Sequence, residues 1–224
     1  DILIRSDAPE AFWRDYFDLG RDYAAISRGF HGGEYLDACV RYGQGIRILR
    51  QEPWEALCSF IISQCNNIKR IKGIVERLCA AYGVETCLDG QRFYTFPAAA
   101  RLAALDEDGL AMLHCGYRAA YILTAARAVA GGELSLDALI DADYVQAKRA
   151  LLALNGVGEK VANCVVLFGL RHMEAFPIDV WMKRSLALHF PDGFDPKPLG
   201  KYAGIAQQYM FYHERWINSE STKK

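Results

Sequence analysis

The sequence predicts a mainly α-helical protein. Apolar residues recur at helical spacing along most of the 224 residues. Runs of alternating or β-branched residues long enough for a sheet are scarce after the first few positions. The 52% hydrophobic content is sufficient for a sizeable folded core. A disordered chain is therefore excluded.

Residues that favour helix ends separate the apolar stretches and set the expected elements in order. Two helices are expected to run from Pro53 to about Ser63 and from Asn66 or Asn67 to about Tyr82. Four further helices are expected to start at Gly116, at Ser135 or Asp137, at Asp143 and at Asp179. The helix after Gly116 should end at Gly131, and the one after Asp179 at about Phe190. Residues 90–97 and 191–198 are expected to be loops.

Residues 2–5 have the composition of a short β-strand. A strand of this length needs a partner, so we expect the sheet to which it belongs to begin before residue 1.

Composition excludes several classes of protein. No apolar run approaches the roughly 20 residues that cross a bilayer, and the N-terminus lacks the features of a signal peptide. The seven cysteines form no CxxC pair and are odd in number, which argues against a disulfide framework or a structural zinc site. No cysteine follows Cys164, so a C-terminal iron–sulfur cluster lacks its ligands. We expect an intracellular protein with reduced thiols.

The formal net charge of -1 argues against binding of nucleic acid by overall charge. One local basic stretch, residues 56–80, holds Lys69, Arg70, Lys72 and Arg77 against the single acid Glu76. Charge alone favours an ordinary solvated helix face for this stretch.

The segment 150–170 indicates a helix, a tight hairpin and a second helix that begins near Glu159. Gly156 and Gly158 permit backbone angles closed to other residues, and they leave backbone amides uncovered beside the positive end of the second helix. Such a turn can hold a phosphate without side-chain charge. By itself, however, Gly-x-Gly usually marks a simple connection between helices.

Lys160 and Asp179 make the hairpin more informative. A lysine in the first helical turn opposes the helix dipole, so its position suggests a role other than stability. Burial and the dipole are both expected to lower its pKa, which produces the neutral amine that a nucleophile needs. Asp179 alone would be taken as a helix cap. Because about three turns of helix and a loop separate Asp179 from the hairpin, the chain can bring its carboxylate back beside the Lys160 amine.

The hairpin and the Pro-x-Asp loop resemble those of the helix-hairpin-helix glycosylase superfamily, and the chain is most similar to the 8-oxoguanine DNA glycosylase family. The likeness spans nearly the whole chain and includes residues 51–55, 63–70, 116–118 and 202–207. It implies two helical subdomains flanking a cleft, with the β-rich N-terminal domain of the family largely absent from this chain.

The resemblance also implies roles for individual residues. Lys160 and Asp179 match the catalytic pair, and Cys164, Gln207 and Phe211 match the base pocket, although core packing alone would explain Cys164 and Phe211. The expected opposite-base and wedge residues are Arg70, Arg118, Tyr117, Asn66 and Cys65, and the expected phosphate contacts are Gly156, Val157, Gly158 and Trp181. No metal and no organic cofactor is implied.

Two positions depart from the family pattern. Cys65 stands where the family usually has an asparagine that contacts the orphaned cytosine, so we expect weaker preference for cytosine opposite the lesion. Trp181 stands where histidine is usual, which alters the expected phosphate contact. The backbone carbonyl that the family's N-terminal domain offers to the oxidised base cannot be located in this sequence.

The resemblance implies a bifunctional glycosylase and AP lyase that removes 8-oxoguanine from duplex DNA through a Schiff base on Lys160. The expected division is a linker from the N-terminal domain packed on the C-terminal helices (1–30), a helical subdomain with the opposite-base residues (31–135) and a helix-hairpin-helix subdomain with the catalytic pair (136–224). We expect a monomer that associates with DNA and not with membranes, in the cytoplasm or nucleoid of a bacterium or the nucleus of a eukaryote. Two alternatives stay open: a monofunctional glycosylase for another damaged base, and a non-catalytic DNA-binding module.

Overall fold

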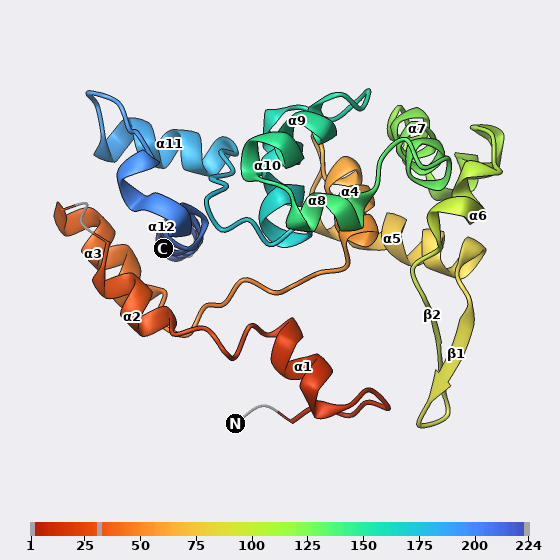
Figure 1. The fold of residues 1–224 in the computed structure, drawn as a ribbon, viewed down its shortest axis with the longest axis horizontal. Coiled ribbons are helices and arrows are strands. Elements are labelled where there is room, and N and C mark those ends of the chain that lie inside the picture. Colours follow the sequence, from red (N-terminus) through yellow and green to blue (C-terminus); the bar gives the residue numbers. More distant parts are fainter. Residues whose placement is uncertain (1–2, 31–32, 222–224) are drawn as a thin grey trace.

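The structure is a computed structural model that describes residues 3–30 and 33–221, with side chains described as far as residue 216 (Figure 1). In chain order its helices are α1 (Glu10–Tyr16), α2 (Tyr23–Arg28), α3 (Gly33–Tyr42), α4 (Pro53–Ile62), α5 (Ile68–Tyr82), α6 (Ala99–Ala103), α7 (Arg118–Ala130), α8 (Leu136–Asp141), α9 (Tyr144–Leu152), α10 (Glu159–Phe168), α11 (Val180–His189) and α12 (Ala203–Ser221). Two 3₁₀ segments, Asp108–Leu113 and Lys197–Tyr202, and the strands β1 (Glu85–Leu88) and β2 (Gln91–Tyr94) complete the described elements. The predicted mainly α fold is confirmed.

Local capping explains where several helices begin. The side chains of Asn67, Ser135, Asp143 and Asp179 each accept a hydrogen bond from the backbone N–H three positions later. Pro53 occupies the first turn of α4, where its missing N–H would have had no partner in the helix. The predicted helix starts at these positions are confirmed.

Two local predictions were wrong. No strand forms at Leu3–Arg5, and Ile2 lies outside the described residues. The predicted loop at 90–97 contains β2, which pairs antiparallel with β1 so that Leu88 faces Gln91. Asp89 and Gly90 both have positive φ, 51° and 77°, as a two-residue hairpin turn requires. The Asp-Gly pair was the sequence signal for this hairpin.

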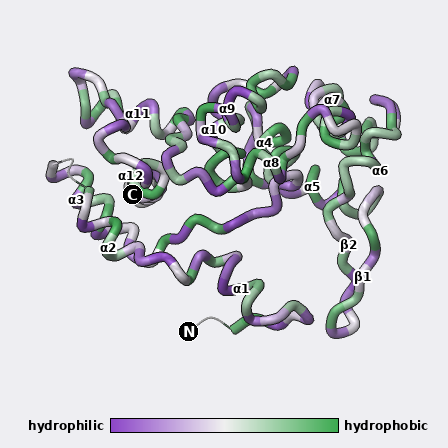
Figure 2. The backbone as a smooth tube through the Cα atoms, in the orientation of Figure 1, coloured by the Kyte–Doolittle hydropathy of each residue, from purple (hydrophilic) through white to green (hydrophobic). Residues whose placement is uncertain are grey.

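Helix α4 lies at the centre of the molecule and packs against α5, α7 and α10 (Figure 1). Seven of its ten residues are buried, including Leu57, Ile61 and Ile62, which are fully enclosed. Seven of the ten residues of α10 are also buried. Most helices carry both hydrophilic and hydrophobic residues along their length, as expected for helices that each bury one face (Figure 2). This arrangement places the hairpin before α10 next to the end of α4.

At the end of the molecule away from the β-hairpin, α12 packs against α3 and α11 (Figure 1). Tyr35 of α3 is bonded through its hydroxyl to Ser185 of α11 at 2.6 Å and to Glu214 of α12 at 2.9 Å. These contacts join a helix near the N-terminus to the two C-terminal helices. The division at residues 30 and 135 stays a prediction.

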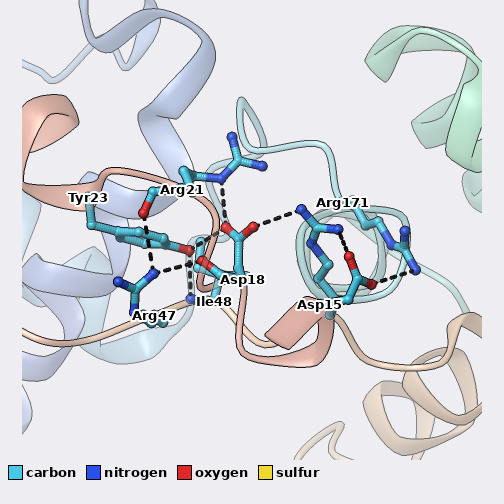
Figure 3. A network of polar contacts seen from close by, with 8 residues as sticks. Asp15, Asp18, Arg21, Tyr23, Arg47, Ile48 and Arg171 are labelled. Atoms are coloured by element: carbon cyan, nitrogen blue, oxygen red, sulfur yellow. Dashed lines mark hydrogen bonds and ion pairs between the residues drawn. The ribbon is translucent and has the colours of Figure 1, made fainter. Parts of the chain in front are cut away.

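A network of polar contacts attaches the segment after α1 to the chain before α4 (Figure 3). Its centre is the carboxylate of Asp18, whose side chain is 1% exposed. Asp18 accepts hydrogen bonds from Arg21 at 2.6 Å, from Arg50 at 2.7 Å and from the Tyr23 hydroxyl at 3.0 Å. Arg47 donates to the backbone carbonyl of Asp18 at 2.7 Å. The network therefore holds the N-terminal helices against the remainder of the fold.

Candidate active site

The hairpin between α9 and α10 is built around Gly156. This residue has φ +85°, and a Cβ atom at its position would lie 2.1 Å from Cγ of Tyr121. The backbone carbonyl of Gly156 accepts a hydrogen bond from the Gln64 side chain at 3.0 Å, and Val157 is buried. A glycine is thus required here by backbone angle and by the packing of Tyr121.

The prediction that both hairpin glycines need special backbone angles was wrong for Gly158. Its φ of -94° and ψ of 178° are extended values that any residue adopts, and nothing lies within 4 Å of a Cβ at this position. Gly158 is the N-cap of α10 and offers no side-chain cap, so the first N–H groups of α10 are left open to a ligand. Their capacity to bind a phosphate together with Gly156 and Val157 stays a prediction.

Replacing Gly156 by alanine should destabilise the fold by about 1–3 kcal/mol, because the new methyl group meets Tyr121 in a strained backbone conformation. Gly158→Ala is the matched control and should cost less than about 1 kcal/mol, since its methyl group meets open space. Urea unfolding of both variants measures the difference. Equal destabilisation by the two substitutions would contradict this account of the hairpin.

Lys160 lies in the first turn of α10 and is half-buried. Its Nζ donates to Oγ of Ser63 at 3.3 Å and lies 5.5 Å from the centre of the Phe60 ring. The neighbouring Glu159 is paired instead with Lys148 at 2.7 Å. Lys160 forms no ion pair with any described residue, so its amine is not held by a carboxylate.

Asp179 is both a helix cap and a wall of the same pocket as Lys160. Its Oδ1 accepts a hydrogen bond from the backbone N–H of Met182 at 2.9 Å. That bond uses one carboxylate oxygen and fixes the side chain at the start of α11. Asp179 therefore caps α11, and its carboxylate keeps further acceptor positions that can bind a group in the pocket.

Both groups line a pocket of about 210 Å³, whose walls come from α4, α10, the loop before α11, and α12. Its lining residues are Phe60, Lys160, Cys164, Phe168, Pro177, Asp179, Gln207, Gln208 and Phe211. Five residues expected from the sequence are thus brought together: the catalytic pair and the three base-pocket residues. Phe60, Phe168 and Gln208 also line the pocket and were not expected. For the two phenylalanines, an aromatic residue on an apolar helix face usually indicates core packing.

The pKa of the Cys164 thiol depends on its burial and on the charges around the pocket. Burial raises its pKa to about 11, the positive charge of Lys160 counteracts that rise, and the negative charge of Asp179 adds to it. The thiol is therefore neutral near pH 7 and serves as a weakly polar wall. The amine and the carboxylate both act on this one sulfur atom, as expected for groups that share a small pocket.

The expected opposite-base and wedge residues do not line this pocket and lie where the turn after α4 meets the turn before α7. Arg70 donates to the carbonyl of His114 at 3.1 Å, and Tyr117 is 54% exposed. Cys65 is exposed with φ +45°, and Asn66 donates to Ile62 at 3.0 Å. The structure brings all five residues of this set together.

Arg118 is the buried member of the set, with 3% of its surface exposed. Its guanidinium donates to the backbone carbonyls of Gln64, Cys65 and Cys115 and lies 4.5 Å from the centre of the Tyr117 ring. In this structure it holds the two turns together. A contact between Arg118 and a base opposite the lesion stays a prediction.

Trp181, in the first turn of α11, does not line the pocket and has the Arg184 guanidinium 5.7 Å from its ring centre. Its contact with phosphate also stays a prediction. Among the described residues no group of three histidine, cysteine or acidic side chains is arranged to hold a metal ion. No helix in the described part of the chain is long and apolar enough to span a membrane.

A helix–hairpin–helix with open amides, followed by a lysine and an aspartate at one pocket, defines the class of helix-hairpin-helix DNA glycosylases. The sequence matches the family described as HhH-GPD superfamily base excision DNA repair protein over residues 58–198, and the N-terminal domain of 8-oxoguanine DNA glycosylase over residues 3–57. The chain belongs to the 8-oxoguanine DNA glycosylase family of the HhH-GPD superfamily.

Individual relatives agree with this family. An N-glycosylase/DNA lyase of Saccharomyces cerevisiae is 41% identical over 154 residues, which are 63% of this chain and 41% of the relative. The structure of MBOgg1 in complex with a low-affinity DNA ligand matches with TM-score 0.88 and 39% identity, over 93% of this chain and 75% of that one. The structure of the 8-oxoguanine glycosylase/lyase of Clostridium acetobutylicum in complex with duplex DNA matches with TM-score 0.86 and 34% identity, over 93% of this chain and 75% of that one. The chain spans less than half the length of the yeast relative.

Proposed function

We propose that the protein is a bifunctional DNA glycosylase and AP lyase that removes 8-oxoguanine from duplex DNA. The observation that carries the proposal is the shared pocket, in which an amine without a carboxylate partner faces the same space as Asp179, Gln207 and Phe211. The names of the yeast and clostridial relatives, a glycosylase/lyase in both cases, support the same activity.

In the proposed reaction the duplex bends and the damaged nucleotide turns out of the base stack into the pocket. Turning out a base costs a few kcal/mol, which contacts to phosphate and insertion of Tyr117 into the vacated space offset. Phe211 stacks on the base and Gln207 bonds its edge. The open amides at the start of α10 supply a phosphate contact despite the net charge of -1.

The chemistry then proceeds in three steps. The unprotonated Nζ of Lys160 attacks C1′ of the sugar, and the glycosidic bond breaks with its electron pair leaving on the base, which takes up a proton. Loss of a proton from the new C–N adduct and opening of the sugar ring give a Schiff base. Removal of a proton from C2′ then expels the 3′ phosphate and cuts the strand. The Asp179 carboxylate stabilises the positive charge that develops on the sugar.

The test is to incubate the protein with a duplex that contains 8-oxoguanine, with and without borohydride, and to measure released base and trapped complex. We expect both released base and a covalent complex that borohydride makes permanent. Released base without a trapped complex would identify a monofunctional glycosylase. Binding without base release would identify a non-catalytic DNA-binding module. Either result would overturn the proposal.

Asp179→Asn should bind the duplex normally but release base about 10²–10³-fold more slowly, because the developing positive charge loses its counter-charge. Asparagine caps helices as well as aspartate does, so the fold should be retained. Asp143→Asn is the matched control: Asp143 caps α9 with the same geometry, at 2.8 Å from the N–H of Gln146, and lies outside the pocket. Single-turnover rates measure the effect, and an Asp179→Asn rate close to that of the control would contradict the role of Asp179.

A protein with these activities acts on DNA, so we propose that it is found in the cytoplasm or nucleoid of a bacterium or in the nucleus of a eukaryote. As the partner we propose double-stranded DNA that contains 8-oxoguanine, bound by one copy of the chain.

A further inference from the structure

Two adjacent glutamines on α12 supply the neutral amide groups of the pocket. Gln207 is 3% exposed and Gln208 is half-buried, and both line the pocket with Lys160 and Asp179. Much of the remaining wall is aromatic, from Phe60, Phe168 and Phe211. The polar edge of a bound base therefore meets the glutamine pair, while aromatic rings are available for its faces.

The two amides are bonded to each other. Nε2 of Gln208 donates to Oε1 of Gln207 at 2.6 Å. Neither side chain makes another hydrogen bond with any described residue. Gln208 therefore engages the carbonyl end of the Gln207 amide and leaves its N–H end for a ligand.

The orientation of such an amide decides which base edge it accepts. An amide has a donor end and an acceptor end, so a neighbour that binds one end leaves the other for the base. The Watson–Crick edge of guanine carries a donor at N1 beside an acceptor at O6, whereas that of adenine carries an acceptor at N1 beside a donor at N6. A mismatch at one of these atoms loses one hydrogen bond and slows the excision of that base.

We propose that Gln208 is a positioning residue that sets the hydrogen-bonding direction of Gln207 and thereby the relative excision of 8-oxoguanine and 8-oxoadenine. This inference rests on the proposed glycosylase function. With Gln208 in place, Gln207 presents its N–H end, which can donate to O6 of the oxidised guanine or to N1 of the oxidised adenine, so the pocket admits both bases.

The test compares single-turnover excision of 8-oxoguanine and of 8-oxoadenine by the unmodified protein, Gln208→Glu and Gln208→Leu. An ionised glutamate only accepts, so Gln208→Glu takes the N–H end of Gln207 and turns its carbonyl oxygen towards the base. The ratio of the 8-oxoguanine rate to the 8-oxoadenine rate should then rise about tenfold, the effect of one hydrogen bond. Gln208→Leu leaves Gln207 free to turn, so its ratio should lie between the other two.

The ratio separates positioning from a merely structural role, because damage to the fold lowers both rates by the same factor. Gln146→Leu, an exposed glutamine on α9, is the control and should leave the ratio unchanged. A ratio that is the same in the unmodified protein and in both variants at residue 208 would overturn the inference alone. If the unmodified protein released neither base, the proposed function would fail as well, and the two failures are thus distinguishable.

Discussion

Lys160→Gln should abolish the borohydride-trapped complex and slow the release of 8-oxoguanine by about 10³-fold or more. The glutamine amide is not a nucleophile, so no bond to C1′ can form. The substitution should leave the fold intact, since the described polar contact of Lys160 is a single hydrogen bond to Ser63, which a glutamine amide can also donate. Trapping on a lesion-containing duplex and urea unfolding together measure the two effects.

Lys148→Gln is the control for this substitution. Lys148 belongs to α9, on the other side of the hairpin, and its partner is Glu159, the residue next to Lys160. The control removes a cation from the same region but leaves the pocket complete, so trapping should persist. A covalent complex that survives in Lys160→Gln would mean that another amine attacks the sugar.

Asp18→Asn should lower the free energy of unfolding by about 3–5 kcal/mol, the effect of removing one partner from a buried ion pair. The carboxylate of Asp18 accepts from two guanidinium groups and one hydroxyl (Figure 3). An asparagine directs an N–H group at one of those donors and removes the counter-charge that two partly buried guanidinium groups share. Urea unfolding at neutral pH, analysed with the midpoint and the slope, measures the loss.

Asp15→Asn is the matched control within the same network. The Asp15 side chain is 52% exposed and pairs with Arg50 and with Arg171, the latter at 3.9 Å. Solvent screens such a pair, so its loss should cost less than about 1 kcal/mol. Similar losses for Asp15→Asn and Asp18→Asn would show that burial of the Asp18 carboxylate does not matter.

The Asp18 network also bears on the pocket. Gln51, which directly follows Arg50, donates its backbone N–H to the carbonyl of Phe168 at 3.1 Å, and Phe168 lines the pocket. The segment matched by the family's N-terminal domain is therefore connected to the wall of the site. No sequence pattern predicts this connection, because it depends on charged residues that look like ordinary surface residues until the fold buries one of them.

Local interactions account for what the sequence alone determined. The helix starts at Asn67, Ser135, Asp143 and Asp179 were predictable because each cap bonds a backbone N–H three positions away. The Asp-Gly turn of the β-hairpin is equally local, since it depends only on the backbone angles of Asp89 and Gly90. That Lys160 and Asp179 share a pocket was predictable from the hairpin, from an unusual lysine position and from resemblance to a family.

The tertiary structure decided which distant residues meet. Lys160 reaches Ser63, 97 positions away in the chain, because α4 and α10 pack against each other. Phe60 and Phe168 join the pocket for the same reason, and Gln208 joins it from α12. No periodicity in the sequence distinguishes such a pocket wall from a core face. The buried guanidinium of Arg118 donates to three backbone carbonyls. These contacts depend on how closely two turns approach each other, and no sequence pattern around Arg118 predicts them.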